Sequence, residues 1–96
     1  MEYYVYILSN KTNTTIYTGV SNNIMRRVYE HRENLNKRSF TARYNVHKLV
    51  YYEIYKEVEY AIAREKQIKS WSRARKNELV ASVNPEWKDL FPEILG

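Results

Sequence analysis

Two tyrosines near the amino terminus are placed so that their phenols could meet in one reactive centre. Tyr6 lies in the apolar and aromatic stretch Tyr3–Leu8, and Tyr17 lies in a similar stretch, Thr15–Thr18. Residues of these types separated by polar turn formers predict a β-hairpin. Such a hairpin places the two phenols directly opposite each other on one face. They then either pack as an aromatic cross-strand pair or converge on a ligand.

An arginine and a histidine follow at helical spacing. Arg27 and His31 are four residues apart in a segment, Ile24–Leu35, whose apolar residues recur with a helical period. Their side chains are therefore neighbours on one helix surface. A guanidinium can hold a phosphate through two hydrogen bonds, and an imidazole can move a proton or orient a water near neutral pH. The same pair could instead belong to a solvated basic edge of the helix.

Glu65 is a carboxylate in an apolar stripe. It falls among Val58, Ala61, Ile62 and Ile68 in a second helical pattern. Burying an unpaired carboxylate costs several kcal/mol, so a cation should meet it. That cation is either a lysine or arginine in a salt bridge, or Mg²⁺ or Mn²⁺ with water and substrate oxygens as its other ligands.

The charge balance favours a polyanionic partner. The formal net charge is +5 and the sequence pI is about 9.5, as in many proteins that bind nucleic acid. Asn77, twelve residues after Glu65, lies within a basic stretch and gives no signal of its own. The basic side chains that we expect to contact a nucleic-acid backbone, although a solvated surface would also explain them, are Lys37, Arg38, Arg43, Lys69, Arg73 and Lys76.

The length and the composition bound the class of protein. Ninety-six residues predict a single domain, 1–96, with a core over about 2–83 and a tail, 84–96, that packs on it. The chain has no cysteine, which fits a reducing compartment and excludes thiolate metal sites. The first residues suit a strand and lack the features of a signal peptide or a spanning helix, so we expect a cytoplasmic location and no membrane partner.

The elements that must position these residues form an α+β domain. A hairpin with its turn centred between Lys11 and Thr12 is followed by the first helix, with Ser21, Asn22 or Asn23 as its N-cap. A third strand is predicted over Lys48–Tyr55, before helices over Val58–Trp71 and Arg73–Val83. The segment 36–45 reads as a loop. Gly19 suggests a tight or unusual backbone conformation just after the second strand.

Taken together, these residues resemble the GIY-YIG nuclease family. The resemblance rests on Tyr4-Val5-Tyr6, on Tyr17-Thr18-Gly19, on the spacing of Arg27 and His31, and on Glu65 in its Ala-Arg-Glu-Lys-Gln-Ile-Lys context. Tyr4 stands where the first motif has glycine, and Thr18 stands where the second has isoleucine. The length and the pattern are similar to those of the small stand-alone members called the UPF0213 group.

The resemblance implies a fold and a set of roles. It implies a three-stranded antiparallel sheet flanked by helices, in the order β-β-α-β-α-α. It places Tyr6 and Tyr17 beside the scissile phosphate and Arg27 in contact with it, and it makes Glu65 the metal ligand. By analogy with some restriction enzymes of the family, His31 and Asn77 also contribute to catalysis.

The expected function is therefore metal-dependent cleavage of nucleic acid. We expect an endonuclease that hydrolyses phosphodiester bonds with one Mg²⁺ or Mn²⁺ and acts on DNA, with structured DNA in repair or processing as one candidate substrate. No small-molecule cofactor is expected, and the chain should act as a monomer or weak homodimer. The alternative is a non-catalytic module that binds nucleic acid through the same basic groove. A structural domain without a specific ligand is a third possibility.

Overall fold

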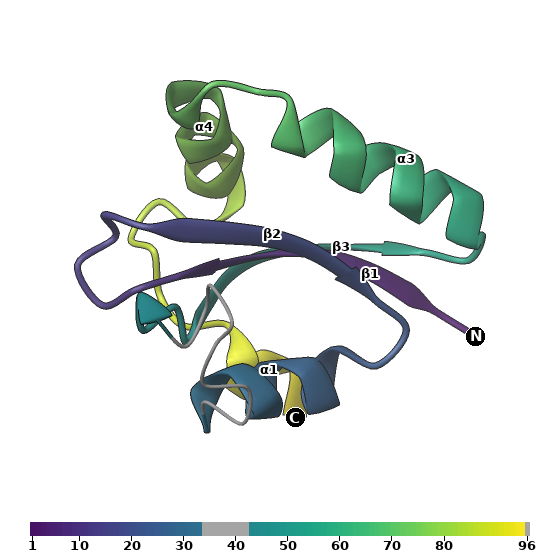
Figure 1. The fold of residues 1–96 in the computed structure, drawn as a ribbon, viewed down its shortest axis with the longest axis horizontal. Helices are drawn as coiled ribbons and strands as arrows, with labels where there is room; N and C mark the ends of the chain where they lie inside the picture. The colour runs from purple at the N-terminus through teal and green to yellow at the C-terminus, as the bar shows by residue number, and fades with distance from the viewer. Residues whose placement is uncertain (34–42, 96) are drawn as a thin grey trace.

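A computed structural model describes residues 1–33 and 43–95 and shows a three-stranded antiparallel sheet with helices on both faces (Figure 1). The strands are paired in the order β2-β1-β3, so β1 is central. The strands are β1 (Tyr3–Ser9), β2 (Ile16–Ser21) and β3 (Lys48–Tyr55). The helices are α1 (Ile24–Arg32), α3 (Val58–Lys69), α4 (Arg73–Val83) and α5 (Phe91–Leu95). The predicted fold class is confirmed, with α5 as an additional short helix in the tail.

Strand β1 supplies both layers of the core, because successive side chains of a strand point to opposite faces. Val5 and Ile7 pack with Ala61, Ile68 and other residues under α3 and α4. Tyr6 and Leu8 pack with residues of α1 on the other face. These four side chains of β1 are fully buried, as a central strand covered on both faces requires. Figure 1 shows α3 and α4 on one side of the sheet and α1 on the other.

The register of the hairpin differs from the prediction. Tyr6 pairs with Gly19 and Leu8 pairs with Tyr17, so the two tyrosines lie on one face but diagonally across the strands. The turn is centred between Thr12 and Asn13, one residue later than expected. Side-chain hydrogen bonds explain the shift: Asn10 Oδ1 accepts from the backbone N–H groups of Thr14 and Thr15. The phenols therefore converge at an angle, with Gly19 beneath one of them.

A bulge in β3 connects the sheet to the carboxy-terminal tail. The pairing of β1 with β3 is shifted between Ile7 and Leu8, and the extra residue, Val50, lies opposite no residue of β1. Its carbonyl oxygen accepts a hydrogen bond of 2.9 Å from Asn84 Nδ2. Asn84 is buried and also bonds both backbone groups of Lys88, so it fixes the path of the tail.

Some element boundaries and one apolar stripe also differ from the predictions. Helix α3 ends at Lys69, and α1 is described as far as Arg32. Val58 and Ile62 are 39% and 40% exposed, so the buried side of α3 is formed by Ala61 and Ile68. The predicted loop over 36–45 lies mostly outside the described residues, and Arg43, at its described end, is helical. None of the helices within 1–33 and 43–95 is long and apolar enough to cross a bilayer.

Candidate active site

Gly19 makes room for the hydroxyl of Tyr6. A Cβ atom built on Gly19 would lie 2.5 Å from Tyr6 Oη and 2.6 Å from Tyr6 Cζ, which is closer than non-bonded atoms approach. The expectation of an unusual backbone at Gly19 is wrong, because its φ is not positive. The position needs glycine for space. The hydroxyl of the buried Tyr6 consequently rests over the backbone of β2, one of the two outer strands of the described sheet.

Tyr6, Tyr17 and His31 form a three-ring cluster on the α1 face. The ring centroids of Tyr6 and Tyr17 are 6.4 Å apart, and His31 lies 6.4 Å from Tyr6 and 5.6 Å from Tyr17. Helix α1 begins at Ile24, where Asn23 Oδ1 caps the N–H of Arg26. The hairpin and the helix that follows it thus bring together three residues that are far apart in the sequence.

Arg27 faces the same hydroxyl. Its guanidinium interacts with the hydroxyl of Tyr6 and lowers the pKa of that phenol, but burial and the neighbouring Tyr17 outweigh it, and the pKa of Tyr6 is raised to about 12. Among the described residues, Tyr6 Oη has no hydrogen bond of regular geometry. Arg27 also bonds Glu30 Oε1 weakly, at 3.4 Å. Arg27 can therefore release Glu30 and bind an anionic ligand without breaking a buried ion pair.

His31 is held in its neutral form. Burial, followed by repulsion from Arg27, keeps the pKa of His31 below its ordinary value of 6.5. A neutral imidazole at pH 7 can accept a proton or a hydrogen bond from water.

Glu65 lies in the opposite layer, within electrostatic range of this cluster. Its helix, α3, packs on the other face of the sheet, but its carboxylate is close enough to the hydroxyl of Tyr6 to raise the pKa of that group. The side chain is 15% exposed, as its place in the stripe predicted, and it forms an ion pair of 3.2 Å with Lys69. Of the two cations considered for Glu65, the structure shows the lysine of a salt bridge.

The residues present are compatible with a divalent metal at Glu65, although the protein offers few ligands. No group of three or more His, Cys, Asp or Glu side chains suited to a metal occurs in the part of the chain that the structure describes. Mg²⁺ is nonetheless often bound by one or two carboxylates together with water and substrate phosphates. A partly exposed carboxylate that pairs with the half-exposed Lys69 meets that requirement.

Asn77 is not brought to this cluster. Its Oδ1 accepts a hydrogen bond of 2.8 Å from Arg73 Nε. The same guanidinium donates to the carbonyl oxygens of Asn13, at 2.6 Å, and Thr14, at 3.0 Å. Asn77 and Arg73 therefore hold the hairpin turn against α4, and a catalytic role for Asn77 stays a prediction without geometric support.

The other basic residues that were predicted to bind nucleic acid are scattered. Lys37 and Arg38 lie outside the described residues. Arg43 is exposed and stacks on the ring of Tyr44. Lys69 is engaged with Glu65, and Lys76 is half-buried on α4. Their contacts with nucleic acid remain predictions.

Sequence reasoning missed one acidic residue close to the end of α1. Asp89, in the tail, forms an ion pair with Arg32, the residue that follows His31. Its Oδ1 also accepts from the backbone N–H groups of Leu49 and Phe91. Asp89 is one of three carboxylates in the tail, with Glu86 and Glu93, so its residue type gave no signal that identifies a partner 57 positions away.

Comparisons with known proteins identify the family. The sequence profile described as "GIY-YIG catalytic domain" matches residues 2–78. A UPF0213 protein from Natronomonas pharaonis is 41% identical over 80 residues, which cover 83% of this chain and 92% of the relative. A UPF0213 protein from Clostridium perfringens is 37% identical over 91 residues, covering 95% and 96% of the two chains.

A solved structure shares the fold. The solution NMR structure of the UPF0213 protein BH0048 from Bacillus halodurans matches with a TM-score of 0.59 at 28% identity, over 93% of each chain. The profile covers the hairpin, α1, β3 and α3, which carry all the residues that meet around Gly19. The chain belongs to the GIY-YIG family of nucleases.

Proposed function

We propose that the chain is an endonuclease that hydrolyses phosphodiester bonds in DNA and that it requires Mg²⁺ or Mn²⁺. The observation that supports the proposal most strongly is the convergence of Tyr6, Tyr17, Arg27 and His31 on one side of β2 with a carboxylate, Glu65, acting on the same hydroxyl. We further propose structured DNA as the substrate, in repair or processing, and a monomer or weak homodimer in the cytoplasm as the acting form. The lack of cysteine is consistent with that compartment.

Each residue of the cluster has a role that its environment favours. Arg27 binds the scissile phosphate and stabilises the charge that builds on it. His31, which is neutral at pH 7, accepts the proton of the attacking water. Tyr6, with a pKa of about 12, remains protonated and donates a hydrogen bond. A phenol with that pKa does not act as a general base at neutral pH, which leaves Tyr17 to orient the water beside His31.

Glu65 is the residue that would hold the metal ion. When bound, a divalent ion there supplies Lewis-acid stabilisation of the phosphate and of the leaving oxygen. Lys69 must release the carboxylate of Glu65 for this to happen, and its exposed side chain can move into solvent.

A cleavage panel tests the proposal. Supercoiled plasmid and branched DNA are incubated with the protein in Mg²⁺, in Mn²⁺ and in chelator, and products are resolved on gels. We expect metal-dependent nicking that Glu65→Ala and Arg27→Ala each reduce at least a hundredfold. Glu59→Ala on the same helix and the exposed neighbour Arg26→Ala change equivalent charges outside the cluster, and both should retain activity.

The panel also separates the alternatives. Salt-dependent binding of DNA by a folded protein that cleaves nothing in either metal would replace the nuclease with a non-catalytic binding module. Cleavage that persists in Glu65→Ala would remove that residue from the mechanism.

A further inference from the structure

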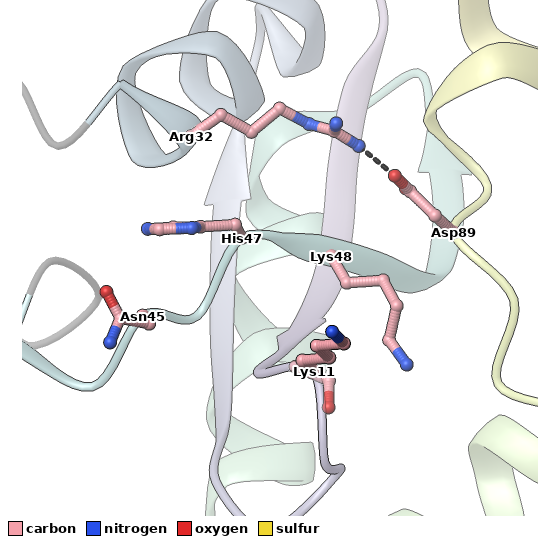
Figure 2. Close-up of a pocket in the computed structure, with 7 residues that line it drawn as sticks. Lys11, Arg32, Asn45, His47, Lys48 and Asp89 are labelled. Atoms are coloured by element: carbon pink, nitrogen blue, oxygen red, sulfur yellow. Dashed lines mark hydrogen bonds and ion pairs between the residues drawn. The ribbon is translucent and has the colours of Figure 1, made fainter.

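A second site lies beside the candidate active site. A cavity of about 360 Å³ opens between the end of β1, the end of α1, the start of β3 and the tail (Figure 2). We call it the basic pocket. It is lined by Ser9, Lys11, Arg32, Asn45, His47, Lys48 and Asp89. In Figure 2 the labelled side chains come from the hairpin turn, the end of α1, the segment around the start of β3 and the tail.

The basic pocket carries an excess of positive charge. Its lining includes three cationic side chains, Lys11, Arg32 and Lys48, and one carboxylate, that of Asp89. Two positive charges are therefore uncompensated at neutral pH. Asp89 is already committed, since it pairs with Arg32 and accepts from two backbone N–H groups. His47 does not add to this charge, because burial and then the charge of Arg32 lower its pKa.

The two lysines keep their charge available. Lys48 Nζ donates to Asn13 Oδ1 at 2.7 Å, and an amide oxygen orients the ammonium without neutralising it. Ser9 Oγ donates to the same oxygen at 3.0 Å and so helps to hold the amide of Asn13 in place. Lys11 is exposed and makes no ion pair with the residues that the structure describes. Arg32 Nε is buried and has no acceptor among those residues.

The position of the basic pocket identifies the kind of anion. Arg32 directly follows His31 on α1, and Ser9 is three residues beyond Tyr6 on β1, so the pocket is next to the ring cluster along both elements. A polymer that presents a phosphate to Arg27 carries further phosphates along the same strand. We propose that the basic pocket binds a phosphate of the nucleic acid that is not cut, and thereby sets where the strand lies relative to the cluster. The inference rests on the proposed function for the identity of the polymer.

Binding measured without cleavage tests the inference. The double variant Lys11→Gln/Lys48→Gln removes both charges, and a glutamine at position 48 can still donate to Asn13. Lys56→Gln/Lys88→Gln is the matched control, since both lysines are exposed and lie outside the pocket. Affinity for a fluorescent oligonucleotide is measured in chelator over a range of salt concentrations. We expect the pocket variant to bind about tenfold more weakly than the control.

The salt dependence should change in the same comparison. Loss of one phosphate contact lowers the slope of log affinity against log salt by roughly 0.7 for a single strand or 0.9 for a duplex. Equal affinities and slopes for the two double variants would overturn the inference, as would the absence of oligonucleotide binding by the wild type at low salt. The experiment measures binding and not cleavage. A failure of the pocket inference can therefore be distinguished from a lack of nuclease activity.

A second arm identifies the source of the phosphate. Backbone amide shifts of Lys11, His47 and Lys48 are followed by NMR during titration with the oligonucleotide and, separately, with inorganic phosphate against chloride at equal ionic strength. Shifts in the oligonucleotide titration that are lost in the pocket variant support a backbone phosphate. Saturable shifts with inorganic phosphate, with unchanged oligonucleotide affinity in the variant, overturn the backbone assignment and identify a site for a free phosphate group.

Discussion

Gly19 determines where the Tyr6 phenol can lie. The two residues pair across the strands, and any side chain on Gly19 would occupy the volume of the Tyr6 hydroxyl. Because the atom in the way belongs to a buried ring, the clash cannot be relieved by a small rotation of a flexible side chain.

Gly19→Ala should therefore displace Tyr6 and lower both stability and activity. We expect a loss of about 1–3 kcal/mol in the free energy of unfolding, as for other overpacked core positions, and at least tenfold in cleavage rate. In a double-mutant cycle with Tyr6→Leu, measured by urea unfolding, the two changes should couple by about 0.5–3 kcal/mol because removal of the ring makes room for the methyl group. Additive effects would show that the two residues do not compete for space.

The pH dependence of cleavage should report on His31. The neutral imidazole is the form that accepts a proton, and its pKa lies below 6.5. Activity should thus be fully developed at pH 7 and decline as the pH falls through the lowered pKa and the ring becomes protonated. In kcat/KM profiles, His31→Gln should lower the plateau by about 10²–10⁴-fold and remove this acid limb. His47→Gln, which changes a ring in the basic pocket, should keep the limb, and a limb unchanged in His31→Gln would assign it to another group.

Short spacings predicted that the side chains of the ring cluster and Arg27 lie close together, whereas their assignment to one site came from the family resemblance. Arg27 and His31 are one helical turn apart, and Tyr6 and Tyr17 lie in neighbouring strands, so local geometry brings them close. The steric requirement for glycine at position 19 could not be predicted, because it depends on the pairing register of β1 and β2. Register in turn depends on how Asn10 bonds Thr14 and Thr15, which a pattern of residue types does not specify.

At the scale of elements, α3 is fixed to the sheet by a polar network next to Glu65. Arg64 Nε and Nη2 both lie 2.9 Å from the carboxylate oxygens of Glu53 on β3. The hydroxyls of Tyr51 and Tyr55 bond the same carboxylate. Burial alone would raise the pKa of Glu53, but these hydrogen bonds outweigh it and the pKa is lowered. Since Arg64 precedes Glu65, the network fixes the rotation of α3 at the position of Glu65.

Arg64→Met should destabilise the fold and should do so in a pH-dependent manner. It leaves Glu53 half-buried without its cation, and we expect a loss of about 1–3 kcal/mol at pH 7. Folding favours ionised Glu53, so this contribution is present above pH 4.5 and is lost as the pH falls through the lowered pKa. Urea unfolding at pH 7 and at acidic pH should show the difference from wild type shrinking.

Arg26→Met is the matched control for that measurement. Arg26 is 67% exposed in its pair with Glu30, so its loss should cost less than about 0.5 kcal/mol at either pH. A cost for Arg64→Met that is equally small would mean that the network does not hold α3.

The helices and strands themselves were largely predictable, whereas the buried side of α3 was not. Its expected stripe included Val58 and Ile62, which are exposed, because the spacing of apolar residues does not specify which side of a helix packs on the sheet. The prediction for Glu65 was nevertheless correct in burial and in needing a cation, since Lys69 lies one turn away.

Across the whole molecule, the tail is the element that closes the α1 face. Leu90, Phe91 and Ile94 pack on the core around Tyr6 and Leu8, and the N–H of Leu90 bonds the carbonyl of Leu49 at 2.7 Å. Asp89 joins this tail to α1 through Arg32. These contacts link residues that are distant in sequence, which is why neither they nor the basic pocket could be read from spacing.

Asp89→Ala should loosen the tail and weaken the whole fold. The backbone N–H groups of Leu49 and Phe91 and the guanidinium of Arg32 lose their acceptor, with an expected cost of about 1–3 kcal/mol in the free energy of unfolding. Urea unfolding measures this loss, and Glu86→Ala, which removes an exposed pairing with Lys88, should stay within about 0.5 kcal/mol of wild type. Similar values for the two variants would show that the tail is held by its apolar residues alone.

The location of Gly19 and Tyr17 on an outer strand has a consequence for what can enter the site. Among the described strands, β2 is paired with β1 alone, and we expect a long molecule to approach it laterally, without threading through the protein. Access of this kind does not depend on a free terminus. A covalently closed circle should therefore be as good a substrate as a linear fragment of the same sequence.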